Sequence, residues 1–96
     1  MVVGVLRLRL RIPENDSLKG KRRVLRQIID RLRSRFAIAV AETGFQDSHQ
    51  DAELGLACVS NDRRVCNALL DRAADFVENS GTVWVTMREL ELINLW

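Results

Sequence analysis

Residues 6–36 read LRLRLRIPENDSLKGKRRVLRQIIDRLRSRF, and the spacing of their apolar side chains changes halfway along. As far as Ile12, leucine alternates with arginine, the period-2 pattern of a half-buried strand. A proline and a polar run then end that strand. From residue 18 to residue 35 the apolar positions follow helical spacing, and Asp16 or Ser17 can cap the first turn. The fold therefore begins with a strand followed by an amphipathic helix.

The rest of the chain repeats these two periods. Residues 36–43 and 52–59 alternate in the manner of strands, and residues 62–79 have helical spacing behind a capping cluster, Ser60-Asn61-Asp62. Residues 82–93 form a last strand whose apolar phase slips near Arg88-Glu89, which indicates a β-bulge. The order βαββαβ in a single domain, residues 1–96, predicts a ferredoxin-like α+β sandwich. Its four-stranded antiparallel sheet carries both helices on one face.

Composition and cysteine use narrow the class of protein. Apolar residues make up 47% of the chain and charged residues 29%, which is typical of a soluble globular domain. Arg7 interrupts the first apolar run, and no run reaches the ~18–20 residues of a membrane span, so we expect a cytoplasmic protein without a membrane partner. Cys58 and Cys66 fall at apolar-face positions. Because the cytoplasm is reducing, two buried thiols are favoured over a disulfide.

Charge is divided unevenly along the chain. Residues 1–35 carry eleven Lys or Arg against three acids, a balance of +8, whereas residues 36–96 carry four against ten, a balance of −6. Such asymmetry indicates either a polyanionic partner or one half of the chain neutralising the other within the fold.

The first helix concentrates the positive charge on one side. At ~100° per residue, five of its basic residues fall within a sector about 100° wide opposite the apolar stripe, interrupted only by Asp30: Lys19, Arg22, Arg23, Arg26 and Arg33. Lys21 lies near the apolar centre, and we expect it to reach solvent by snorkelling from the first turn. Phosphate contact and an ordinary solvated helix face both fit this pattern. The expected nucleic-acid-binding residues are Lys19, Lys21, Arg22, Arg23, Arg26 and Arg33.

The sheet face away from the helices should carry small apolar side chains, and contiguous exposed apolar surface usually marks an interface. We expect homodimerisation there. Arginines 7, 9 and 11 lie alongside and should pair across strands with Glu53, Glu89 or Glu91. Base stacking on this face is rejected, because the first and third strands contain no aromatic residue. The expected dimer-interface residues are Val3, Val5, Ala37, Ala39, Ala41, Gly55 and Ala57.

Catalytic and metal-binding patterns are weak. His49 is the only histidine and falls in a predicted loop, which argues against an activated nucleophile. Asp47, His49 and Asp51 are a poor metal set. The run SLKGKR lacks Walker spacing, although Gly20, which costs ~1 kcal/mol in a helix relative to alanine, suggests a close approach by a ligand or by backbone. We expect no enzyme activity, cofactor or metal.

Three segments together carry a resemblance. SLKGKRRVLRQIIDRLRSRF (17–36), VAETGFQD (40–47) and LGLACVSND (54–62) resemble the YlxP-like family, small bacterial proteins catalogued as a domain of unknown function. The resemblance implies a ferredoxin-like fold, a bacterial cytoplasmic setting and, through neighbouring genes for translation initiation and ribosome maturation, a link to RNA. The family supplies no catalytic residues. This chain departs from it where His49 stands near a position that is commonly aromatic.

Two functional hypotheses of different class follow. In the first, the basic helix holds the phosphates of structured RNA or of a ribosomal particle, without catalysis. In the second, the chain is a homodimeric interaction module that uses its sheet face and binds no nucleic acid.

Overall fold

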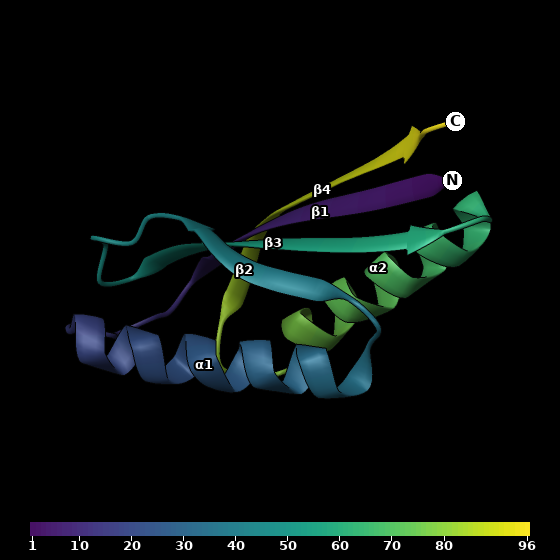
Figure 1. Ribbon diagram of the computed structural model, residues 1–96. Coiled ribbons are helices and arrows are strands. Elements are labelled where there is room, and N and C mark those ends of the chain that lie inside the picture. Colours follow the sequence, from purple (N-terminus) through teal and green to yellow (C-terminus); the bar gives the residue numbers. More distant parts are fainter.

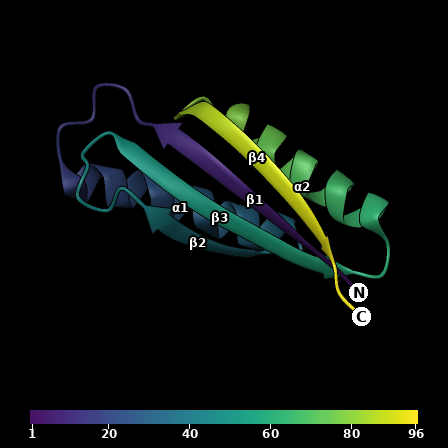
Figure 2. The same cartoon turned by 90° about the horizontal axis from the view of Figure 1, so that it is seen from above.

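In the computed structural model, which describes all 96 residues, the chain forms four strands and two helices in the predicted order. The strands pair antiparallel in the order β2-β3-β1-β4. Figures 1 and 2 show both helices on the same face of this sheet, so the ferredoxin-like α+β fold is confirmed. The elements are β1 (Val2–Arg11), α1 (Leu18–Arg35), β2 (Ala39–Gly44), β3 (Asp51–Ser60), α2 (Arg63–Glu78) and β4 (Trp84–Asn94).

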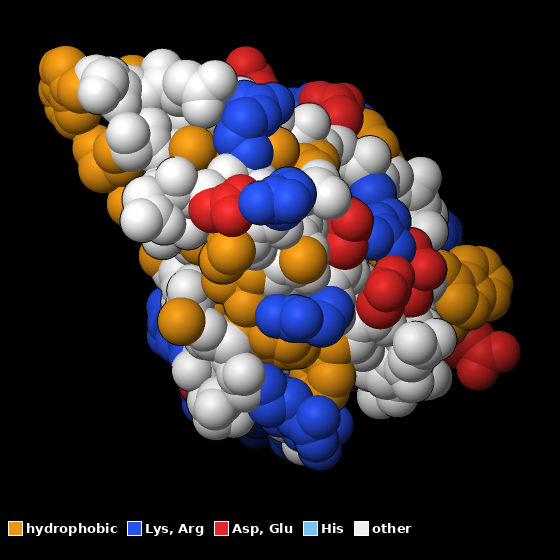
Figure 3. Space-filling view, turned by 90° about the vertical axis from the view of Figure 1, so that its right-hand side faces the viewer, with side chains coloured by type: hydrophobic (Ala, Val, Ile, Leu, Met, Phe, Trp, Pro, Cys, Tyr) orange, Lys and Arg blue, Asp and Glu red, His pale blue; other side chains and the backbone are white.

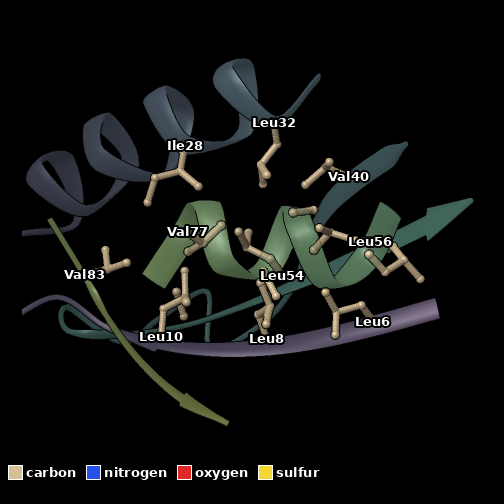
Figure 4. Packing of buried hydrophobic residues seen from close by; sticks show 14 of the residues in the cluster. Leu6, Leu8, Leu10, Ile28, Leu32, Val40, Leu54, Leu56, Val77 and Val83 are labelled. Carbon is tan, nitrogen blue, oxygen red and sulfur yellow. The ribbon is translucent and has the colours of Figure 1, made fainter. Parts of the chain in front are cut away.

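The core lies between the sheet and the two helices. Alternate residues of β1 and β3 point towards the helices, and α1 and α2 each bury one apolar stripe against them. Figure 4 shows side chains from both helices, from β1, β2 and β3, and from Val83 just before β4, converging in this layer. Burial of apolar area at roughly 25 cal/mol per Å² is the main stabilising contribution. The fully buried leucines of this layer include Leu8, Leu32, Leu54 and Leu70.

Helix α1 starts and ends on local hydrogen bonds. The Ser17 side chain accepts from the backbone N–H of Gly20 at 3.0 Å, an N-cap. A Cβ on Gly20 would collide with the Asn15 side chain, so the close approach expected at this glycine comes from the chain itself. Phe36 ends the helix by donating its N–H to Leu32, and β2 therefore begins at Ala39 rather than at residue 36.

The predicted β-bulge in β4 is present but lies closer to the strand's start. Arg9 of β1 pairs with Met87, whereas Leu10 pairs with Val85, which leaves Thr86 as the extra residue. The Thr86 hydroxyl donates to the carbonyl of Arg9 at 3.2 Å. The expected position at Arg88-Glu89 is wrong by two residues, because the partner's register decides where the extra residue fits.

Cys58 and Cys66 are both buried and free, as predicted. Burial, reinforced by the neighbouring Cys66, raises the pKa of the Cys58 thiol to about 11. A thiol of that kind is inert, because only the thiolate is nucleophilic. Neither helix combines the length and apolar character that crossing a membrane requires.

Candidate nucleic-acid interface

The outer side of α1 carries the basic stripe, which we define as Lys19, Arg22, Arg23, Arg26 and Arg33. All five residues are exposed. Four of them, together with Gln27 and Asp30, line a shallow hollow along the helix. Figure 3 views the molecule towards the C-terminal end of α1; basic side chains gather at the bottom of the view, where that end lies, whereas positive and negative side chains alternate above them.

No residue of the basic stripe forms an ion pair with a carboxylate of the chain. Most acids of the second half contact other basic residues. On α2, Asp71, Asp75 and Glu78 all contact Arg88 of β4, at 2.9–3.6 Å. The charge asymmetry of the sequence is therefore not neutralised at α1, and the stripe keeps its positive potential.

Lys21 departs from its expected role. Its side chain is only 2% exposed, and its ammonium donates to the backbone carbonyls of Phe45 and Ser48 and lies 3.8 Å from Glu42. The expectation that Lys21 snorkels to solvent is wrong, because these acceptors satisfy the ammonium inside the fold. Lys21 holds the β2–β3 connection against α1 and is not available to a phosphate.

Arg33 lies at the C-terminal end of the stripe and has a partner within the chain. Its guanidinium donates to the carbonyl of Val40 at 2.7 Å, which ties α1 to the edge strand β2. A second hollow runs between α1 and this edge; its polar lining is three arginines, Arg22, Arg26 and Arg33, with the acids Asp30 and Glu42. The positive surface therefore extends from the outer side of α1 towards the edge of the sheet.

The face of the sheet away from the helices, here called the open face, holds a wide hollow of about 800 Å³. Six of the seven residues expected at a dimer interface lie on this face. Ala37 is the exception, because it precedes β2. Val59, at 65% exposed, and Ile93 add larger apolar side chains near Val3, with which both pair. The six residues are Val3, Val5, Ala39, Ala41, Gly55 and Ala57.

Arg7 and Arg9 of β1 pair across strands with two of the expected carboxylates, whereas Arg11 takes a partner that was not expected. Arg7 donates twice to Glu89, at 2.8 and 3.1 Å, and Arg9 lies 3.4 Å from Glu53. The hydrogen bond from Thr43, at 2.8 Å, and the nearby guanidinium groups lower the pKa of Glu53 despite its burial. Arg11 pairs with Asp51 at 3.1 Å. Glu91, also named as a candidate partner, takes no ion pair.

Two exposed aromatic residues lie at the end of the open face that is remote from the termini. Trp84 is 61% exposed and is the cross-strand partner of Arg11, and Phe45 is 44% exposed with its ring 5.4 Å from the guanidinium of Arg9. The prediction excluded stacking because β1 and β3 lack aromatic residues. These two aromatics come instead from β4 and the β2–β3 connection. The position of the bulge at Thr86 was the missing signal, because it decides which way Trp84 points.

No group of three or more His, Cys, Asp or Glu side chains comes together in a way that could hold a metal ion. Asp47 and His49 of the β2–β3 connection and Asp51 of β3 accordingly form no such site. His49 takes part in the structure through its carbonyl, which accepts from the Asn15 side chain.

Comparison with known proteins agrees with this geometry at the level of fold and family. The designed protein Foldit4 superposes with a TM-score of 0.52 at 13% identity, covering 99% of this chain and 98% of its own. A REP-associated tyrosine transposase bound to a REP hairpin matches with a TM-score of 0.47 at 9% identity, over 98% of this chain and 57% of its own, which is too slight to support an argument.

The sequence comparisons are more specific. The uncharacterized protein YlxP of Bacillus subtilis (strain 168) is 30% identical over 90 residues, which cover 94% of this chain and 98% of the relative. Residues 3–89 match the family model described as "Protein of unknown function (DUF503)". The chain therefore belongs to the DUF503 family, as its resemblance to YlxP-like proteins predicted.

Proposed function

We propose that this protein binds structured RNA, or a ribosomal particle, through the basic stripe, and that it does so without catalysis. The observation that carries the proposal is the absence of any ion pair between the stripe and the chain's carboxylates, although the chain holds thirteen acids. A one-sign surface that the fold leaves unpaired attracts phosphate, and each phosphate contact releases counterions.

The form of the stripe supports backbone contact rather than sequence reading. Arg22, Arg23 and Arg26 project from a continuous helix whose buried side fixes its orientation. Arginine presents a planar fork of donors that suits phosphate oxygens, and such contacts position a protein without reading bases. No aromatic side chain interrupts the stripe. An RNA helix, which is recognised mostly by its shape and its phosphates, fits these properties.

Reversal of charge on the stripe tests the proposal. Replacing Arg22, Arg23 and Arg26 with Glu should abolish binding of an RNA hairpin, because three attractive contacts become repulsive. Fluorescence anisotropy with a labelled hairpin measures the affinity, and circular dichroism checks that the fold is retained.

A matched control is available on α2. Replacing Arg63, Arg64 and Arg72 with Glu changes the net charge from +2 to −4, as the α1 variant does, but at exposed positions outside the stripe. The control variant should keep most of its affinity. Equal losses in the two variants would show that net charge alone governs binding, and an α1 variant with unchanged affinity would end the proposal.

A second candidate function is self-association through the open face. The specific observation is the hollow floored by small residues such as Ala39, Gly55 and Ala57, with exposed Val59 beside it. Small side chains allow two sheets to approach closely. The rows of arginine and glutamate around the hollow also make the face complementary to a second copy of itself, as a twofold interface requires.

Ala39→Glu tests this interface. A carboxylate placed at the floor of the hollow would be buried without a partner, so the variant should be monomeric where the wild type is dimeric. Sedimentation velocity distinguishes the two states. Gln46→Glu, on the exposed β2–β3 connection, adds the same charge away from the hollow and should leave the dimer intact. A wild-type protein that sediments as a monomer would contradict the interface.

A further inference from the structure

We propose that the outer end of the open face binds unpaired nucleotides of the same RNA, by stacking bases on Trp84 and Phe45. We call this surface, made of Phe45, Arg9, Arg11 and Trp84, the aromatic end. The inference rests on the proposed function, because the RNA held by the basic stripe would deliver the unpaired segment. It adds a second contact of different chemistry and names the RNA feature that this contact recognises.

The two aromatic rings lie on the same face of the sheet, the open face. Arg11 and Trp84 are direct cross-strand partners, and side chains of such partners lie on the same face of a sheet. The bulge at Thr86 restores this arrangement, since without the extra residue Trp84 would turn towards the core. Phe45 reaches the same face from the β2–β3 connection, with its ring over Arg9.

Both rings are exposed to solvent. Trp84 is 61% exposed and Phe45 is 44% exposed, and neither ring packs against another aromatic ring. A ring left in water on a sheet face contributes little to folding, because its apolar area is not buried. Aromatic rings on an open sheet that also presents basic groups are the surface on which nucleobases stack in single-stranded RNA recognition.

Two positively charged side chains lie between the rings. The guanidinium groups of Arg9 and Arg11 lie between the two aromatics and are held in place by Glu53 and Asp51. Their side chains remain 42% and 44% exposed, so each keeps donors free for a phosphate or a base edge. Guanidinium planes also stack on bases. Two rings flanking two fixed cations suit a short run of nucleotides better than an apolar protein segment.

The aromatic end lies close to the N-terminal part of the basic stripe. Figure 2 shows that β1 ends, β4 begins and α1 starts at the end of the molecule away from both termini. Lys21 binds the carbonyls of Phe45 and Ser48, which fixes the Phe45 segment against the first turns of α1. The N-terminal part of the stripe and the aromatic end are therefore neighbours around one rim. The unpaired end of an RNA helix bound to α1 could reach the open face around this rim.

The aromatic end does not overlap the hollow proposed for self-association. The lining of that hollow ends at Arg7, Thr43, Glu53 and Glu89, and includes neither Trp84 nor Phe45. A dimer formed over the hollow would leave the aromatic end at its periphery. The two contacts are compatible and can be tested separately.

Two RNA probes test the inference: a blunt hairpin, and the same hairpin with an unpaired oligouridine tail. The wild type should bind the tailed hairpin about tenfold more tightly, the size of effect expected for stacking of one or two bases. Trp84→Ala should lose this gain and keep its affinity for the blunt hairpin. Trp84→Tyr should restore the gain, because a second aromatic ring supports the same stacking.

The chain provides a matched control and a direct signal. Trp96 is fully exposed at the opposite end of the molecule, so Trp96→Ala removes an exposed tryptophan without touching the site. In a Trp96→Phe background, the fluorescence of Trp84 should be quenched by the tailed hairpin and not by the blunt one. Phe45→Asn, which suits the positive φ of 61° at this position better than alanine would, should weaken tail binding as Trp84→Ala does.

The outcomes separate this inference from the proposed function. Equal wild-type affinity for the two hairpins, or an equal loss in the Trp84→Ala and Trp96→Ala variants, would overturn the inference and leave the α1 contact standing. Quenching of Trp84 by oligouridine alone, without binding of the blunt hairpin, would overturn the α1 contact and support the inference. A Trp84→Ala variant that changed sedimentation but not RNA affinity would assign Trp84 to a protein interface and overturn the inference.

Discussion

At the scale of single residues, Lys21 shows how one buried charge joins two segments. Its ammonium, on the first turn of α1, is surrounded by the carbonyls of Phe45 and Ser48 and the carboxylate of Glu42. A buried charge without such partners would cost several kcal/mol, and with them the lysine fixes the path of the β2–β3 connection. That connection in turn presents Phe45 on the open face.

Replacing Lys21 with Met should therefore destabilise the domain. Methionine keeps the apolar stem but leaves two carbonyls without a donor, at roughly 1–3 kcal/mol for each group that water does not reach. Urea unfolding followed by circular dichroism gives the free energy. Lys19→Met, two residues earlier and exposed, is the control and should change stability by less than about 0.5 kcal/mol. Equal effects at the two positions would mean that the Lys21 contacts contribute nothing.

Helical spacing in the sequence correctly placed Lys21 on the apolar side of α1, but it did not reveal which groups accept hydrogen bonds from its ammonium. Helical spacing places a residue on one side of a helix, whatever its chemistry. The acceptors are backbone carbonyls of a segment more than twenty residues away, and a polar loop sequence does not reveal where its carbonyls point. The outward residues of the stripe, such as Arg22 and Arg23, were predictable because a charged side chain in water needs no partner from the rest of the chain.

At the scale of secondary-structure elements, Gly4 decides how closely α2 approaches the sheet. A Cβ at this position would lie 2.8 Å from a methyl group of Leu70 on α2 and 3.3 Å from the sulfur of Cys58. Leu70 is fully buried, so it has no free space into which it can move. The glycine is needed for packing here, not for an unusual backbone angle.

Gly4→Ala should accordingly destabilise the domain by about 1–3 kcal/mol, the usual cost of overpacking. The double variant Gly4→Ala with Leu70→Ala tests the cause, because a smaller residue 70 removes the collision. The destabilisation in the double variant should be less than the sum of the two single changes, measured by urea unfolding in a double-mutant cycle. Strict additivity would show that the loss comes from elsewhere.

Element boundaries were predictable only where the signal is local. The Ser17 cap follows from side-chain chemistry within one turn, and α1 has the predicted bounds. β2 starts later than expected because Phe36 ends α1 and packs against Phe76 of α2, with ring centroids 6.0 Å apart. The local phase slip predicted a bulge in β4, but its position at Thr86 depends on the register with β1, which the local pattern does not fix. This register also decides that Trp84 belongs to the open face.

At the scale of the whole molecule, the fold neutralises part of the positive charge of the first half, on the sheet, and leaves the charge on the outer side of α1 unpaired. Arginines 7, 9 and 11 of β1 take their partners from the acids of the second half, and Arg88 takes those of α2. The acids that could have quenched α1 are thus held on other surfaces. The chain has a net charge of only +2, yet it keeps one strongly cationic side.

The salt dependence of RNA binding should report this local surface rather than the net charge. If the four outward cations Lys19, Arg22, Arg23 and Arg26 each contact a phosphate, the logarithm of the affinity should fall against the logarithm of salt concentration with a slope of roughly −2.8 to −3.6. Arg23→Ala should reduce the magnitude of that slope by about 0.7–0.9, since one counterion fewer is released. Arg72→Ala removes the same charge from α2, outside the stripe, and should leave the slope unchanged. A slope that depends equally on Arg23 and Arg72 would show that the whole protein's charge, and not the α1 surface, meets the RNA.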